Sequence, residues 1–246
     1  KIKNIAGTSA GAMVGLLFCI GYNPIEVFKF MKLVKLEKTR HIDMTNLITK
    51  FGLDNGQRIM LVLTKLLKSR NYSEDITFKE LYDKTFINFT VTGSCINDKK
   101  AYYFSHTTYP YMKVLKAIRI SMAVPIFFTP VQFENKIFVD GCCLDNYPIH
   151  LFNDRLYNVL GLYILDNREY VSNIRCIEDY LGNTINCLLD GMVQKIDGIY
   201  KNHTITITCN NFGDTINDVI SLFDTGYNSI ITKIESNFFT HLYISI

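Results

Sequence analysis

The sequence of 246 residues contains no tryptophan and no apolar run long enough to cross a bilayer. The absence of tryptophan excludes nothing by itself, whereas the shortness of the apolar runs does. The longest of them, from Met13 to Tyr22, falls well below the roughly 20 residues that a membrane-spanning helix needs. If this protein meets a membrane, we expect the contact to be made from the surface.

An excess of one charge is also missing. Lysine and arginine number 26 and the acidic residues 23, which gives a net charge of +3. A balance this mild argues against nucleic acid as a partner. Hydrophobic residues make up 48% of the chain and charged residues 20%, which is typical of a globular protein with a real core. We find no repeat or linker, so we expect a single domain over residues 1–246.

The seven cysteines include no CxxC pair, and their scattered spacing suits neither a zinc ribbon nor a disulfide framework. Free thiols in a reducing compartment are the simplest interpretation, which predicts a cytoplasmic protein. The sequence also contains no phosphate-binding loop, nucleotide fingerprint or cluster of metal ligands. We therefore expect no metal and no organic cofactor.

Strand patterns alternate with helix patterns along the chain. Strands are predicted over 2–6, 89–96, 101–105, 136–139, 159–165 and 204–209. Helices are predicted over 12–20, 24–36, 43–69 with a break at 52–56, a short capped helix from 77, 111–121, 174–199 and 218–238. This alternation indicates an α/β layered fold with a largely parallel sheet.

The first strand and helix enclose the pentapeptide from Gly7 to Gly11, which matches G-x-S-x-G. In this motif a serine sits on a sharp strand-to-helix turn, and the glycines allow the following helix to approach closely. The start of the helix offers backbone N–H groups, here that of Ala10, to a developing oxyanion. Ser9 is therefore a candidate nucleophile.

A second constellation lies more than a hundred residues downstream. It consists of RISMAVP at 119–125, FFTPV at 127–131 and DGCCLDNYP at 140–148. Together with the motif around Ser9, these segments resemble the patatin-like phospholipase family, in the family's order and with sensible spacing. The resemblance implies a three-layer α/β fold with helices on both faces of a mostly parallel central sheet.

Carried over position by position, the resemblance implies that Ser9 is the nucleophile and Asp140 the general base of a dyad without histidine. Gly7, Ala10 and Gly11 would form the elbow backbone, and Gly141, Cys142, Asn146 and Pro148 the supporting motif. The implied activity is hydrolysis of carboxylic esters of lipids through an acyl-enzyme, on a lipid or membrane-surface substrate. Because an ordinary carboxylate is a weak base at neutral pH, the fold must raise the pKa of Asp140.

Two departures keep other interpretations open. Cys142 stands where the family has glycine or alanine, and the glycine-rich oxyanion loop that the family places before the elbow is missing, so we expect upstream sequence to be absent. A lipid-binding or interaction protein with impaired catalysis is one alternative. A Ser-Asp-His esterase is another, with Asp166 and either His203 or His241 completing a triad with Ser9.

Overall fold

The structure is a computed structural model. The residues that it describes are 1–33, 43–166, 198–209 and 216–236, together with residues 174, 180, 183, 184 and 187. The predicted helix over 174–199 falls almost wholly outside these residues, as do His41 and His241.

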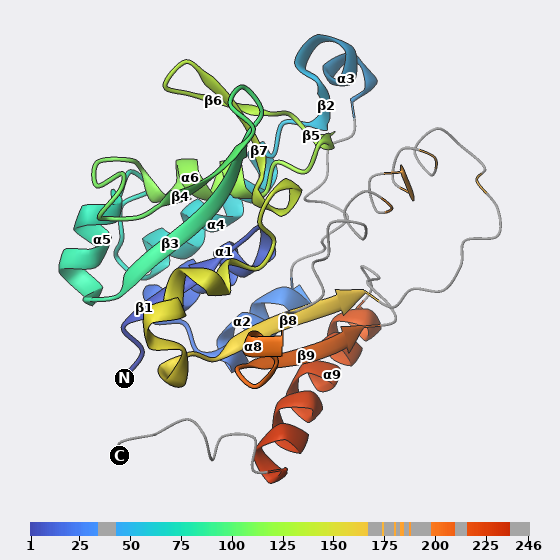
Figure 1. The fold of residues 1–246 in the computed structure, drawn as a ribbon. Helices are drawn as coiled ribbons and strands as arrows, with labels where there is room; N and C mark the ends of the chain where they lie inside the picture. Colours follow the sequence, from blue (N-terminus) through green and yellow to red (C-terminus); the bar gives the residue numbers. More distant parts are fainter. Residues whose placement is uncertain are drawn as a thin grey trace.

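Strands and helices alternate as predicted (Figure 1). The strands are β1 (Asn4–Gly7), β2 (Gly52–Asp54), β3 (Asn88–Cys95), β4 (Lys100–Phe104), β5 (Ile126–Phe128), β6 (Val131–Phe133), β7 (Lys136–Asp140), β8 (Gly161–Asp166) and β9 (Thr204–Cys209). The helices are α1 (Ala10–Cys19), α2 (Pro24–Leu33), α3 (Met44–Lys50), α4 (Gln57–Ser69), α5 (Phe78–Thr85), α6 (Val114–Ser121), α8 (Gly198–Lys201) and α9 (Ile216–Glu235), with 3₁₀ segments η2 (Gly141–Cys143) and η3 (Pro148–Asn158).

The main sheet is more mixed than the predicted, largely parallel one. Its strand order is β1-β3-β7-β6, and β4 pairs with β3 off this path. The β1–β3 pair is parallel, but β4, β7 and β6 join in antiparallel pairs. Two of these pairs are set locally, because a tight turn joins β3 to β4 and another joins β6 to β7, and a short turn can only connect antiparallel neighbours. The third pair, β3 with β7, joins segments far apart in the sequence. Parallel pairing recurs in β2–β5 and β8–β9. The α/β class itself is confirmed.

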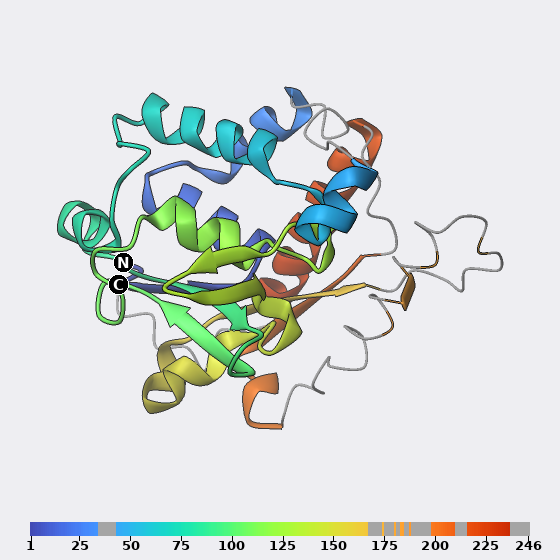
Figure 2. The ribbon, with the colours of Figure 1, turned by 90° about the horizontal axis from the view of Figure 1, so that it is seen from above.

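Helices lie on both faces of the strands. Helix α1 contacts β1 and β3, α6 contacts β3 and β7, and α4 packs on α6. Figure 2 shows these helices together on one side and the η3 segment on the other. Helix α9 packs on β9 and α2, where Phe28 and Phe223 stack with ring centroids 4.1 Å apart. Among the described residues, no helix combines the length and hydropathy that crossing a membrane requires.

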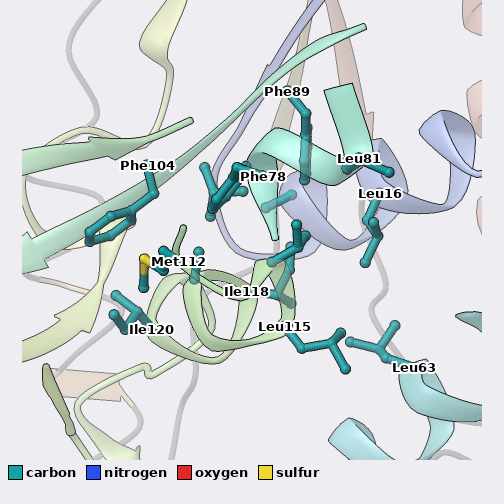
Figure 3. Packing of buried hydrophobic residues seen from close by; sticks show 14 of the residues in the cluster. Leu16, Leu63, Phe78, Leu81, Phe89, Phe104, Met112, Leu115, Ile118 and Ile120 are labelled. Carbon is teal, nitrogen blue, oxygen red and sulfur yellow. The ribbon is translucent and has the colours of Figure 1, made fainter. Parts of the chain in front are cut away.

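The core fills the space between the main sheet and α6 (Figure 3). Helix α6 buries Val114, Leu115, Ala117, Ile118 and Ile120. It approaches β3 so closely that a Cβ on Gly93 would lie 2.6 Å from Ile120. This close packing brings the carboxyl end of α6, and with it the start of the RISMAVP segment, to the point in the sheet where β1 ends.

Local sequence signals set several element boundaries. Thr77 and Glu80 form the predicted capping box of α5. Gly21 has a φ of +88°, as expected of a glycine that ends a helix. Helix α6 begins at Val114 rather than at position 111, because Lys113 is extended and bridges Thr77.

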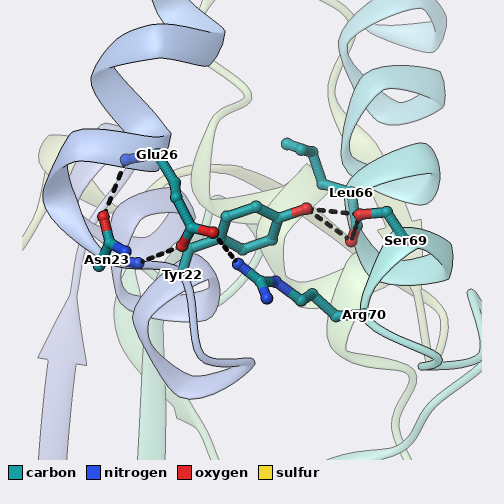
Figure 4. A network of polar contacts seen from close by, with 6 residues as sticks. All are labelled: Tyr22, Asn23, Glu26, Leu66, Ser69 and Arg70. Atoms are coloured by element: carbon teal, nitrogen blue, oxygen red, sulfur yellow. Dashed lines mark hydrogen bonds and ion pairs between the residues drawn. The ribbon is translucent and has the colours of Figure 1, made fainter.

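A polar network joins the start of α2 to the end of α4 (Figure 4). Asn23 and Glu26 exchange two hydrogen bonds of 2.9 Å, and Arg70 donates to Glu26 at 2.6 Å. The Arg70 guanidinium lies 4.3 Å from the Tyr22 ring centroid, and the Tyr22 hydroxyl reaches Ser69. These contacts fix α1 and α2 against α4, away from the site.

Candidate active site

The turn between β1 and α1 has the geometry of a nucleophile elbow. Ser9 precedes the first helical residue with φ 53° and ψ −120°. A non-glycine residue in such a conformation costs on the order of 1–3 kcal/mol, and it persists only where the surrounding structure holds it. A Cβ on Gly7 would lie 2.7 Å from the backbone of Gly11 and Ala12, so Gly7 lets α1 fold back over the strand.

The second glycine of the motif has no such role within the described structure. A Cβ added at Gly11 would meet no atom of the described residues within 4 Å. The sequence-based expectation that both glycines permit close approach therefore fits Gly7 alone.

Ser121 holds the backbone of Ser9 in place, a role that the sequence did not reveal. The Ser9 N–H donates to the Ser121 hydroxyl at 2.8 Å, and Ser121 is fully buried at the end of α6. Ser121 is the serine of the RISMAVP segment, which the sequence marked as part of a signature without a function. This contact explains why that segment accompanies the elbow.

The arginine of the same segment has a structural role. Arg119 donates to the Thr129 carbonyl and hydroxyl at 2.8 and 2.9 Å, and to the Asn55 carbonyl at 3.1 Å. It thereby joins α6 to the segment between β5 and β6 and to the turn after β2. Burial lowers its pKa, and Asp54 opposes that effect. None of these contacts reaches Ser9.

The start of α1 offers a free donor beside Ser9. Gly11 N–H donates to the Thr8 carbonyl, and Ala12 and Met13 N–H groups donate to the Ser9 carbonyl. Within the described part of the chain, the Ala10 N–H makes no such bond. At a helix N-terminus an unpaired N–H can stabilise an anion. The oxyanion role of Ala10 stays a prediction.

Asp140 reaches the elbow through the register of the sheet. Gly7 pairs with Val91 of β3, and Asp140 pairs with Gly93 two residues further along. On its other side, β3 pairs with β4 at both positions, so β1 and β7 lie on the same side of β3. Their carboxyl ends meet there, opposite positions of β3 that are two residues, or about 7 Å, apart. The turn at Ser9 then carries its side chain toward the carboxylate. Residues 131 positions apart in the sequence are brought together in this way.

Asp140 is fully buried, and its two carboxylate oxygens differ. Oδ1 accepts the Cys142 N–H at 2.9 Å, whereas Oδ2 is buried with no hydrogen-bond partner in the described structure. Burial raises the pKa of Asp140 to about 6, against the opposing effects of the Cys142 N–H and the Ser9 hydroxyl. A buried oxygen without a partner beside a serine hydroxyl is poised to accept a proton.

The remaining motif residues have separate roles. A Cβ on Gly141 would lie 2.7 Å from the Thr92 carbonyl and 2.9 Å from the Thr8 methyl, so only glycine fits there. Pro148 is buried at the start of η3. Asn146 is exposed, and its side chain makes no hydrogen bond to the described residues. The structure thus gives a packing reason for Gly141 and Pro148 but none for Asn146.

Cys142 contacts Asp140 through its backbone and also through its thiol. The bond to Asp140 comes from the Cys142 N–H, which any residue except proline could provide. Hydrogen bonding with Cys143 and burial raise the pKa of the Cys142 thiol, and the Asp140 charge adds to this effect. A thiol kept neutral is a poor nucleophile. The larger side chain therefore leaves the carboxylate's hydrogen bond in place, which weakens the argument for impaired catalysis.

The structure contradicts the triad alternative for His203. Asp166 pairs with Cys209 at one end of the parallel β8–β9 pair, and His203 directly precedes Thr204 at the other. Six residues of strand at ~3.3 Å each separate them by about 20 Å. His106 and His150 hydrogen-bond to Asn88 and Tyr103. Within the described residues, no three or more His, Cys, Asp or Glu side chains form a group that could hold a metal.

Fold and site define an α/β protein in which a strained serine at a strand-to-helix turn lies beside a buried aspartate. A family model described as patatin-like phospholipase matches residues 1–153, more than half of the 246 residues. The chain belongs to this family. The match ends within η3, so it includes both Ser9 and Asp140.

Two viral proteins are similar to this chain. An uncharacterized protein of Acanthamoeba polyphaga mimivirus is 27% identical over 95% of this chain and 83% of its own length. A protein of invertebrate iridescent virus 6, named as a probable lipid hydrolase, is 30% identical over 61% of this chain and 53% of its own. Neither match identifies a substrate for this chain.

Solved structures show the same fold. VipD from Legionella pneumophila matches with a TM-score of 0.55 at 15% identity, over 95% of this chain and 61% of that one. The type III effector ExoU matches with a TM-score of 0.50 at 14% identity, over 96% of this chain and 47% of that one. The chain thus spans about half to three fifths of these two proteins, and the likeness concerns the fold.

Proposed function

We propose that this chain hydrolyses carboxylic ester bonds of lipids, with Ser9 as nucleophile, Asp140 as general base and an acyl-enzyme as intermediate. The observation that carries the proposal is the buried, unpartnered Oδ2 of Asp140 beside the strained Ser9. Membership of the patatin-like phospholipase family and the viral relative named as a lipid hydrolase support the substrate class.

Acylation begins when the Ser9 hydroxyl transfers its proton to Asp140 as Oγ attacks the ester carbonyl. The carbonyl oxygen becomes an oxyanion, which the Ala10 N–H and the positive end of α1 stabilise. The tetrahedral intermediate then collapses. The alcohol leaves with the proton held by Asp140, and the acyl group remains on Ser9.

Deacylation repeats these steps with water. Asp140 takes a proton from a water molecule, which attacks the acyl carbonyl, and the same N–H stabilises the second oxyanion. The fatty acid departs as Ser9 regains its proton. One carboxylate serves both halves of the reaction, so neither a histidine nor a cofactor takes part in these steps.

The substrate would be reached at a lipid surface, by peripheral contact. Two lysines of α2 offer positive charge there, although Lys32 lies over the Phe28 ring, whose other contact is Phe223 of α9. Part of the apolar side of α2 is therefore occupied by packing, whereas Ile25 and the two lysines are exposed and could contact a lipid surface.

The test is ester hydrolysis by matched variants, measured on a soluble short-chain ester and on phospholipid vesicles. Ser9→Ala and Asp140→Asn should each lower kcat by at least about 10³-fold, because each removes a group that acts in both half-reactions. His203→Ala is the control and should keep its rate. Full activity in Ser9→Ala, or loss of activity in a folded His203→Ala variant, would overturn the dyad.

A further inference from the structure

Four hydrogen bonds converge on Asp145, a residue of the loop that follows Asp140. Its N–H donates to the Gly141 carbonyl at 2.8 Å, and its Oδ1 accepts the Tyr147 N–H at 3.2 Å. Its Oδ2 accepts the Tyr103 hydroxyl at 2.8 Å, and its carbonyl accepts the Thr8 hydroxyl at 3.1 Å. The first two bonds shape the loop itself, whereas the other two join it to β4 and to the elbow.

The bond from Thr8 matters because of where Thr8 lies. It directly precedes Ser9, whose strained backbone needs support on both sides. The Ser121 hydroxyl provides that support at the Ser9 N–H. Thr8, only 8% exposed, provides it on the preceding residue, and its methyl group packs where a Cβ on Gly141 would clash. The elbow and the loop behind Asp140 are therefore in direct contact.

Tyr103 connects the Asp145 side chain to the main sheet. Tyr103 belongs to β4 and pairs with Thr92 of β3, one residue from the position opposite Asp140. Its hydroxyl also lies 3.2 Å from His150 Nε2, and His150 Nδ1 lies 3.7 Å from Asp145 Oδ2. The Asp145 side chain is only 14% exposed. Because the Asp145 carboxylate is held by several neighbours, it fixes the position of the loop that follows Asp140.

We propose that Thr8 and Asp145 form a positioning link, anchored by Tyr103, that fixes Ser9 relative to Asp140. The inference rests on the proposed function, since it assigns a role in the same dyad. Neither residue touches the reacting atoms. Thr8 acts by holding the elbow, and Asp145 acts by holding the loop that begins with the Asp140 carboxylate.

The test compares Thr8→Val with Thr8→Ser. Valine keeps the shape of threonine but cannot donate to the Asp145 carbonyl, whereas serine keeps the donor. Thr8→Val should lower kcat about 10- to 100-fold with KM unchanged, since a misplacement of ~1 Å can cost that much. Thr8→Ser should retain most of the rate. Tyr103→Phe removes only the anchoring hydroxyl and should also lower kcat. This variant tests the proposal independently if Thr8→Val does not fold.

A second readout separates positioning from loss of stability. If the loop loosens, water reaches Asp140 and its pKa falls, so the acid limb of the kcat profile moves to lower pH in Thr8→Val. Thr85→Val is the matched control, because the Thr85 hydroxyl bonds to the Leu81 carbonyl in α5, remote from the site. Thr85→Val should lower the melting temperature but leave the acid limb of the kcat profile at the same pH.

The outcomes distinguish this link from the proposed function. Thr8→Val and Tyr103→Phe variants with unchanged kcat and an unmoved acid limb, in an enzyme whose Ser9 is active, would overturn the link alone. A folded wild-type chain that hydrolyses no ester and reacts with no serine-directed probe would overturn the proposed function, and the link with it.

Discussion

At the scale of single residues, the burial of Asp140 serves its proposed role as a base but lowers the stability of the fold. Its ionised form is useful only because it is poorly solvated, and poor solvation costs free energy. A pKa of about 6 in place of the ordinary 3.8 corresponds to about 3 kcal/mol between the two protonation states. The folded protein therefore holds the Asp140 proton more tightly than the unfolded chain does.

The stability of an Asp140→Asn variant follows from that difference. Since the folded pKa is the higher one, wild-type Asp140 loses stability as pH rises from about 4 to about 6, and the neutral amide does not. We expect the variant's advantage in free energy of unfolding to grow by up to about 3 kcal/mol between pH 4 and pH 8. Urea denaturation at the two pH values measures it. Asp75→Asn, at an exposed position, is the control; an equal pH-dependent gain there would contradict the explanation.

The pH dependence of hydrolysis follows from the same group. Asp140 accepts a proton only when ionised, so kcat should fall as pH drops through about 6 and should level off above it. A wild-type profile on a soluble ester measures this limb. A limb near the ordinary 3.8 would mean that burial does not tune Asp140.

Elements position Ser9 and Asp140 through one tight turn and two strand pairings, β1 with β3 and β7 with β3. At the elbow, Gly7 and Gly11 provide a matched pair. Gly7→Ala forces a Cβ against the backbone of α1 and should destabilise the protein by about 1–3 kcal/mol or more. Gly11→Ala meets open space in a helix and should stabilise it by about 0.5–1 kcal/mol. Thermal unfolding of both variants checks this, and the reverse order would contradict the assignment of the elbow contact to Gly7.

Local signals in the sequence predicted the elements well. The β1–α1 unit, the capping box at Thr77 and the hairpin of β3 and β4 all follow from residues close together in the chain. The arrangement of the mixed sheet does not follow from such local signals. Its pairing joins segments far apart in the sequence and is set by packing that no short pattern encodes. The same limit applies to the site. Ser9 and Asp140 were predicted, but the Ser9–Ser121 bond spans 112 positions and has no local signature.

In the whole molecule, Ser9 and Asp140 lie where the carboxyl ends of β1 and β7 meet beside β3, and the proposed reaction needs only groups of this chain. Removal of divalent metal ions should therefore leave kcat unchanged. Dialysis against a chelator, followed by assay with and without added Ca²⁺ or Mg²⁺, measures this. Loss of activity on dialysis, restored by one metal, would contradict the mechanism.

The most direct test of the central claim is labelling of the protein with a fluorophosphonate, read by peptide mass spectrometry, with Ser9→Ala beside it. The reagent reacts only with an activated serine, so it reports the nucleophile without assuming a substrate. We predict a single labelled site at Ser9, lost in Ser9→Ala and slowed in Asp140→Asn. Labelling at another serine, or undiminished labelling in Asp140→Asn, would contradict the Ser9–Asp140 dyad.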